Sequence, residues 1–242
     1  MGNPAVSIII CHYSLVDDFG GGRALLEDKT RSEMLRETMF SLIENTDYPA
    51  DIIVIDNGGK PDDSDFLLEL TRLGKINTYV RNKNNMYFGF AWNQGAKLAT
   101  SDYLCFTCND IHFGKSWLQE TIMPLLKYPD RKYIATPLVT PDKDRVKWQR
   151  GHNEDGYRLN SMAGSNCMVM HKNVYKDVGE FTTHRIAGSH WHRKMHTMGY
   201  TIVAPPENKV EHLARNGGVD FYKDIRVTKE LIDGSVIDFS SL

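Results

Sequence analysis

Asn109 and Asp110 stand at the end of an apolar run, YLCFTC, at residues 103–108. Such a run is typical of a strand that is buried on both faces of a parallel sheet. The acid then lies at the carboxyl end of the strand, which is the edge where open α/β sheets bind ligands. A carboxylate is a hard oxygen ligand, and in that place it is suited to hold Mg²⁺ or Mn²⁺ against a diphosphate. We therefore take Asp110 as the centre of the predicted site.

The elements that must position this acid alternate along the first half of the chain. Strands are expected at residues 6–11, 52–55, 76–80 and 103–108. Between them, apolar residues recur at helical spacing, as at Leu35, Met39, Leu42 and Ile43. The resulting order, β-α-β-α-β-α-β, predicts a mostly parallel sheet that is covered by helices.

Polar residues also follow two other predicted strands. Tyr13 comes soon after the first strand, and Asp56 directly follows the second. Carboxyl ends of parallel strands form one ligand-binding edge. We expect both residues to lie at the same edge as Asp110.

The second half of the chain is less regular. Helices are expected at residues 117–126 and 189–198, and a closing helix at 222–232. Strands are expected at 133–139, 165–171 and 200–203, with a loop or hairpin within 145–159. A chain of 242 residues stays below the length at which single cores usually split, so we expect one domain over residues 1–242.

Composition narrows the classes of function. The net charge of −2 predicts no broad cationic surface for nucleic acid or anionic lipid. No run of about 18 apolar residues is present, so we expect a soluble, cytoplasmic protein. Cys105 and Cys108 form a C-x-x-C pattern, but residues three apart in a strand face opposite sides. We therefore interpret the cysteines as reduced, buried side chains and not as a redox pair.

Three segments together resemble the family 2 glycosyltransferases: VSIIICHYS, IIVIDNGG and NNMYFGFAWNQGAKLATSDYLCFTCND. The resemblance covers about residues 6–212. It implies an α/β fold of the GT-A type, with a Rossmann-like, mostly parallel central sheet and helices on both faces. It also implies that residues 1–110 bind the nucleotide sugar, whereas residues 111–242 bind the acceptor and close the site.

This resemblance suggests donor contacts. Asp56 is expected to contact the base or ribose of the nucleotide, with Tyr13 nearby. Gly89 and Asn93 are expected to let the chain approach the donor, and Asn109 joins them as a donor-binding residue.

The resemblance also suggests the metal ligands. It makes Asp110 the acid that holds Mn²⁺ or Mg²⁺. VEHLARNGG is similar to a C-terminal histidine segment of some family members. That similarity makes His212 a second candidate ligand.

Residues 189–200, SHWHRKMHTMGY, depart from the family pattern. Relatives have an acidic pair here, and its aspartate is the general base of an inverting transfer. The corresponding positions are Ser189 and His190, followed by His192. A histidine with a pKa of ~6.5 can abstract the same proton, so both histidines are candidate bases. Alternatively, both pack around Trp191.

The resemblance and the residues together predict a metal-dependent, inverting glycosyltransferase. It would move a sugar from a nucleotide diphosphate sugar to an acceptor hydroxyl, with Trp148 or Trp191 as a stacking face for a sugar ring. The acceptor stays open between a saccharide, a lipid-linked glycan, a protein and a modified nucleic-acid base. Two alternatives are a sugar-nucleotide-binding protein without transfer activity and a nucleotidyltransferase, which would release pyrophosphate.

Overall fold

The computed structural model describes residues 5–14, 30–140, 149–152, 155–160, 167–182, 187–206 and 208–213. The helix predicted at 222–232 and the candidate acceptor residue Trp148 lie outside these residues. Among the described residues, no helix is both long and apolar enough to cross a membrane.

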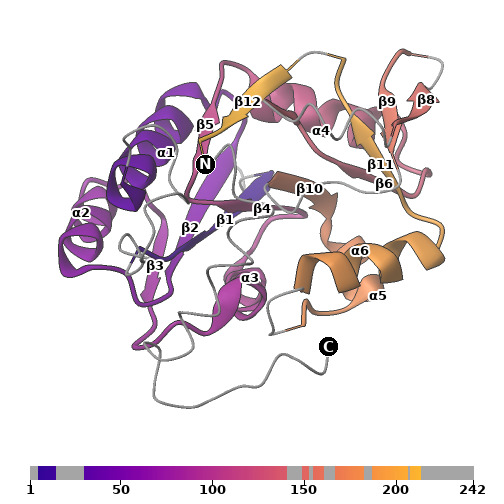
Figure 1. Cartoon of the computed structure of the whole chain (residues 1–242). Coiled ribbons are helices and arrows are strands. Elements are labelled where there is room, and N and C mark those ends of the chain that lie inside the picture. The colour runs from indigo at the N-terminus through magenta and orange to yellow at the C-terminus, as the bar shows by residue number, and fades with distance from the viewer. Residues whose placement is uncertain are drawn as a thin grey trace.

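Strands and helices alternate in the first half of the chain, as predicted (Figure 1). The elements are β1 (Val6–His12), α1 (Arg31–Asn45), β2 (Ala50–Asp56), α2 (Pro61–Arg72), β3 (Thr78–Arg81), α3 (Tyr87–Leu98) and β4 (Tyr103–Cys108). β3, β2, β1 and β4 lie side by side in that order, and every pair is parallel. This arrangement brings the carboxyl ends of the four strands to one edge.

The second half extends the same sheet and adds a small one. Its elements are β5 (Ile111–Phe113), α4 (Trp117–Lys127), β6 (Tyr133–Ala135), β7 (Leu138–Thr140), β8 (Gln149–His152), β9 (Arg158–Asn160), β10 (Cys167–His171), α5 (Lys172–Val178), α6 (Ala187–Thr197), β11 (Thr201–Ala204) and β12 (Asn208–His212). β10 pairs antiparallel with β4, and β6, β11, β9 and β8 continue the sheet to nine strands. β5, β12 and β7 form a separate sheet of three strands.

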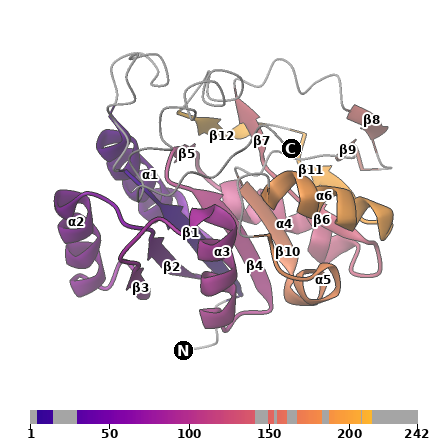
Figure 2. The ribbon, with the colours of Figure 1, turned by 60° about the horizontal axis from the view of Figure 1, so that its bottom comes forward.

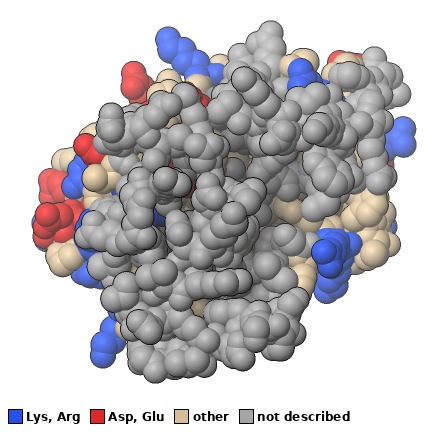
Figure 3. Space-filling view, in the orientation of Figure 1, with Lys and Arg blue, Asp and Glu red and all other residues tan. Residues whose placement is uncertain are grey.

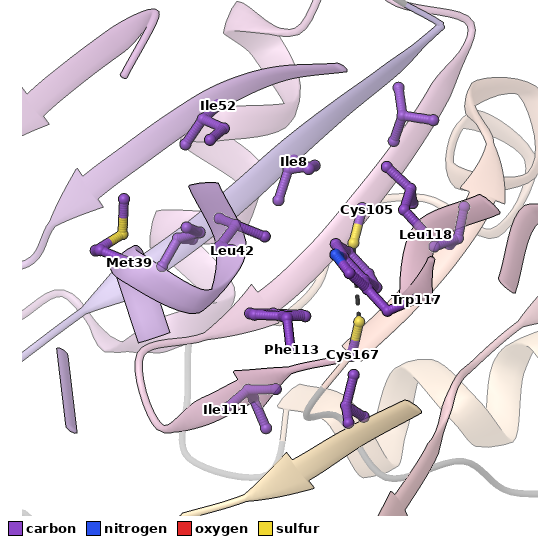
Figure 4. Packing of buried hydrophobic residues seen from close by; sticks show 14 of the residues in the cluster. Ile8, Met39, Leu42, Ile52, Cys105, Ile111, Phe113, Trp117, Leu118 and Cys167 are labelled. Atoms are coloured by element: carbon purple, nitrogen blue, oxygen red, sulfur yellow. Dashed lines mark hydrogen bonds between the residues drawn. The ribbon is translucent and has the colours of Figure 1, made fainter. Parts of the chain in front are cut away.

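Helices cover both faces of the large sheet (Figure 2). Side chains of α1, α2 and α4 pack on one face, where they join Ile8 and Ile10 of β1 in one apolar cluster. Figure 4 shows Met39 and Leu42 of α1 and Trp117 and Leu118 of α4 within this cluster. Side chains of α3, α5 and α6 pack on the other face with Ile9 and Cys11. The alternation along β1 places consecutive residues in different layers.

Close packing between α3 and β1 depends on Gly95. A Cβ atom at that position would collide with the side chain of Ile9. The absence of a side chain therefore lets α3 lie directly on the central strand. The mostly parallel sheet with helices on both faces confirms the predicted fold class.

Most predicted strands differ from the structure by a residue or two at their ends, and for two of them the contacts suggest a reason. The strand predicted at 133–139 is divided into β6 and β7. Pro137 lacks an N–H for the ladder, and the Thr136 hydroxyl donates instead to the carbonyl of Cys167. β3 begins at Thr78 and not at residue 76, because Asn77 uses its side-chain oxygen to accept the N–H of Ile52.

Figure 3 shows where the described charged side chains lie on one face of the molecule. On the face drawn in Figure 3, acidic side chains gather over α2, where Asp62, Asp65 and Glu69 are exposed. The described Lys and Arg side chains on this face are dispersed and form no broad basic area.

Candidate active site

Asp110 lies in the short turn between β4 and β5, at the carboxyl edge of the parallel strands. Its side chain is only 16% exposed. The Oδ1 atom is buried and has no hydrogen-bond partner among the described residues. A buried carboxylate oxygen without a donor is costly, and a bound cation would satisfy it.

His212 lies beside this carboxylate although the two residues are far apart in the sequence. β12 pairs antiparallel with β5 and places His212 opposite Ile111. The His212 Nε2 atom is 3.3 Å from Asp110 Oδ2, and the backbone N–H of Leu213 donates to the Asp110 carbonyl over 2.8 Å. The small sheet therefore brings the two predicted metal ligands together.

The electrostatics of the pair favour an ionised acid. Burial by itself raises the pKa of Asp110, but the hydrogen bond and the charge of His212, the charge of Arg31 and a backbone hydrogen bond together outweigh burial. The pKa of Asp110 lies below its ordinary value as a result. A carboxylate that stays ionised is available to bind a cation.

Asp110 and His212 offer two donors of types that suit Mn²⁺, one oxygen and one imidazole nitrogen. The described part of the chain contains no cluster of three or more such residues. Waters and phosphate oxygens would have to complete the coordination, as they commonly do for Mg²⁺ at nucleotide sites. These donors and the unsatisfied Oδ1 fit a divalent cation that is shared with a substrate.

Asn109, predicted to bind the donor, is 7% exposed and contacts His12. The Asn109 Nδ2 atom lies 2.9 Å from Nδ1 of His12. His12 ends β1, is fully buried, and was not predicted as a site residue. Its sequence signal is a polar residue directly after the apolar run VSIIIC. The contact fixes the turn that carries Asp110.

Asp56 ends β2 at the predicted edge, but it is fully buried. Its Oδ1 accepts the N–H of Gly59 over 2.7 Å, and its Oδ2 accepts the hydroxyls of Ser64 and Tyr79 over 2.5 and 2.8 Å. A Cβ atom at Gly59 would lie 2.6 Å from His12 Nε2, so this close turn requires glycine. Asp56 thus organises the turn after β2. Its contact with a nucleoside stays a prediction, and one of these hydrogen bonds would have to be replaced by a bond to the nucleoside.

Tyr13 and Gly89 were also predicted to contact the donor. Tyr13 follows β1 and is half-buried. Burial raises the pKa of its phenol, although a hydrogen bond with Asn85 opposes the rise. Gly89 is buried in the first turn of α3. The roles of both residues in donor binding stay predictions.

Asn93 is 4% exposed and joins α3 to the segment after α5. Its Oδ1 accepts the hydroxyl of Tyr175 and the N–H of Phe181, both over 2.9 Å. Its Nδ2 donates to the carbonyl of Phe181 over 2.8 Å. These three bonds give Asn93 a structural task, and the geometry does not favour its predicted contact with the donor.

The two candidate bases on α6 have different surroundings. His190 is exposed, whereas His192 is 2% exposed and its Nε2 lies 3.1 Å from the sulfur of Met168. Trp191 is 3% exposed, donates to the carbonyl of Gly179 over 2.8 Å, and packs on Phe181 with ring centroids 4.9 Å apart. For Trp191 and His192 the structure therefore favours the packing alternative over contact with an acceptor.

Comparison with known proteins gives related sequences and folds. The family model described as "Glycosyl transferase family 2" matches residues 29–195, which is more than half of the chain. The polypeptide N-acetylgalactosaminyltransferase 8 of Drosophila melanogaster is 24% identical over 157 residues, or 64% of this chain and 24% of the relative. The chain thus spans about a quarter of that relative's length.

Solved structures share the fold at low sequence identity. A mannosyltransferase of Pyrobaculum calidifontis in complex with GDP-Man and Mn²⁺ superposes with a TM-score of 0.68 and 17% identity, over 96% of this chain and 63% of the other. GalNAc-T7 with UDP, GalNAc and Mn²⁺ superposes with a TM-score of 0.66 and 15% identity, over 93% of this chain and 49% of the other. TarS of S. aureus superposes with a TM-score of 0.62 and 13% identity, over 98% of this chain and 67% of the other. With its family model matched and its fold shared with these structures, the chain belongs to glycosyl transferase family 2.

Proposed function

We propose that this protein transfers a sugar from a nucleotide diphosphate sugar to an acceptor hydroxyl, with inversion at the anomeric carbon and with Mn²⁺ or Mg²⁺ as cofactor. The observation that carries the proposal is the Asp110–His212 pair at the carboxyl edge of the sheet, with one carboxylate oxygen unsatisfied. Solved structures with the same fold contain GDP-Man or UDP together with Mn²⁺, which supports a donor of this class.

Asp110 and His212 would hold the cation. When bound there, it supplies positive charge for the departing diphosphate. Asn109 and His12 keep the turn of Asp110 in place. Tyr13 and Gly89 would contact the nucleoside. Rigid support of this kind lowers the cost of reorganisation during the reaction.

The transfer exchanges one bond at the anomeric carbon for another. The bond from this carbon to the diphosphate oxygen breaks, and its electron pair leaves with the nucleoside diphosphate. The acceptor oxygen forms the new bond and loses its proton to a base. We propose His190 as that base, since it is exposed whereas His192 is buried.

An assay with a panel of UDP-, GDP-, CDP- and dTDP-sugars and Mn²⁺ tests the proposal. We expect release of the nucleoside diphosphate from one donor, by hydrolysis or by transfer to added saccharides. Release of pyrophosphate would instead indicate a nucleotidyltransferase. Donor binding without product, across saccharide, protein and nucleic-acid acceptors, would indicate a binding protein.

Substitution of the central acid makes the assay specific. Asp110→Asn should lower turnover about 100-fold or more, because the site loses a charged ligand. Asp102→Asn is the matched control, since Asp102 precedes the other end of β4 and is 73% exposed. Equal turnover in the Asp110→Asn variant and the wild type would contradict the assignment of the metal site.

A further inference from the structure

One face of α1 lies against the small sheet, and Arg31 is the first residue on that face. Arg31, Thr38 and Asn45 are seven residues apart, which in a helix keeps them on one side within about 20° per step. Thr38 accepts the N–H of Ile111 over 3.1 Å, and Asn45 donates to the carbonyl of Phe113 over 2.8 Å. Both partners belong to β5. The side of α1 that carries Arg31 therefore faces β5.

The direction of α1 places Arg31 near the turn of Asp110. Asn45 at the end of α1 is level with Phe113, and Thr38 in its middle is level with Ile111. Movement toward the start of α1 thus runs along β5 toward Asp110. Arg31 lies two turns beyond Thr38, at the end of α1 that approaches the ligand-binding edge.

A separate set of contacts ties the first turn of α1 to the same edge. The hydroxyl of Ser32 donates to Asp63 over 2.8 Å. The same Asp63 oxygen lies 3.8 Å from His12 Nε2, and the His12 ring contacts Asn109, the neighbour of Asp110. The residue next to Arg31 is thereby linked through two side chains to the turn that carries the metal acid.

Charge effects agree with this placement. Burial lowers the pKa of His12 to about 4, and the charge of Arg31 contributes to the lowering. Burial raises the pKa of Tyr13, and Arg31 opposes that rise. The guanidinium thus acts on two groups at the end of β1.

A nucleoside diphosphate would add negative charge next to the ionised Asp110. A guanidinium matches a phosphate with two parallel hydrogen bonds, which makes arginine suited to this group.

We propose that Arg31 is a binding residue for the diphosphate of the donor, which it would contact from α1, beside the β4–β5 turn where Asp110 and His212 would hold the cation. This inference rests on the proposed function. Arg31 would also bind the departing nucleoside diphosphate, so that its charge favours the step in which the bond to the sugar breaks.

Calorimetric titration with UDP, GDP, CDP, dTDP and ADP in the presence of Mn²⁺ identifies the nucleoside diphosphate that the wild type binds. The same titration then uses that diphosphate, its monophosphate and its nucleoside on Arg31→Gln and Arg31→Lys. Arg72→Gln is the matched control, because it removes the same charge from the last turn of α2, where Arg72 is 69% exposed. Circular dichroism shows whether each variant is folded.

Arg31→Gln should weaken binding of the diphosphate roughly 10- to 100-fold and leave binding of the nucleoside unchanged. Arg31→Lys should lie between this variant and the wild type, and Arg72→Gln should match the wild type. Undiminished diphosphate binding in folded Arg31→Gln, or an equal loss for diphosphate and nucleoside, would overturn the role of Arg31. Absence of diphosphate binding by the wild type would instead overturn the proposed function, and the role of Arg31 with it.

Discussion

His12 and Asn109 connect the ends of two neighbouring parallel strands, with His12 Nδ1 2.9 Å from Asn109 Nδ2. Because an amide nitrogen donates, Nδ1 accepts and the neutral ring carries its proton on Nε2. That nitrogen is buried without a hydrogen-bond partner among the described residues, and Asp63 is 3.8 Å away. The site thus contains a neutral imidazole directly behind the turn of the metal acid.

The buried ring predicts a loss of stability in mild acid. Burial lowers the pKa of His12 from 6.5 to about 4, although the charges of Asp56 and Asp63 oppose this. The unfolded chain binds the proton at higher pH than the folded chain. The contribution of His12 to the free energy of unfolding is therefore fully present above pH 6.5 and is lost as the pH drops toward 4. The loss from this group should reach about 3 kcal/mol.

Urea unfolding of the wild type and of His12→Asn at pH 7, 5.5 and 4.5 measures this contribution. The variant has no titrating ring, so its free energy of unfolding should change less between these pH values. His196→Asn, a change at an exposed position of α6, should keep the pH dependence of the wild type. If His12→Asn and the wild type lose stability in parallel, the lowered pKa of His12 is wrong.

Substitution of Asn93 is expected to lower the stability of the protein and to leave donor binding unchanged. Asn93→Ala would leave the Tyr175 hydroxyl and the Phe181 N–H without their acceptor in the interior. We expect a loss of about 2–4 kcal/mol in the free energy of unfolding. Asn173→Ala, at an exposed position of α5, should change stability by less than about 0.5 kcal/mol. Normal stability of Asn93→Ala together with lost donor affinity would restore Asn93 as a donor contact.

The sequence predicted the order of the first seven elements because β1, β2 and β4 are mainly apolar and buried, and helical periodicity separates them. The antiparallel strands of the second half have as few as three residues, as in β6 and β9, and such short pairs leave little periodicity to read. For residues 145–159 either a loop or a hairpin was expected, and the described part contains the antiparallel pair of β8 and β9.

Polar residues at the ligand-binding edge were harder to assign. Asp56 and Asn93 lie among apolar and small residues, and this pattern is the same whether the partner is a ligand or the protein itself. Only the fold reveals that Gly59, Ser64 and Tyr79 satisfy Asp56. By contrast, Asp110 and His212 were both chosen from the sequence, and the pairing of β5 with β12 places them together.

His212 predicts a measurable contribution to metal binding. His212→Ala removes the imidazole that lies 3.3 Å from Asp110, so the affinity for Mn²⁺ should fall about 10-fold or more. Electron paramagnetic resonance of free Mn²⁺ in the presence of UDP or GDP measures this affinity without turnover. His171→Ala is a suitable control, because His171 ends β10 opposite Tyr103, at the start of β4 and away from Asp110. An unchanged Mn²⁺ affinity in His212→Ala would contradict its role as a ligand.

The exposed histidine of α6 predicts the kinetic signature of a general base. If His190 accepts the proton of the acceptor hydroxyl, His190→Ala should lower kcat about 100-fold or more and leave the affinity for the donor unchanged. His192→Ala should act mainly on stability, because its ring is buried against Met168. His196→Ala removes another exposed imidazole from the same helix and should keep the kcat of the wild type. Retained kcat in His190→Ala would show that another group takes the proton. A loss of kcat in His192→Ala, with normal stability, would instead indicate that His192 is the base.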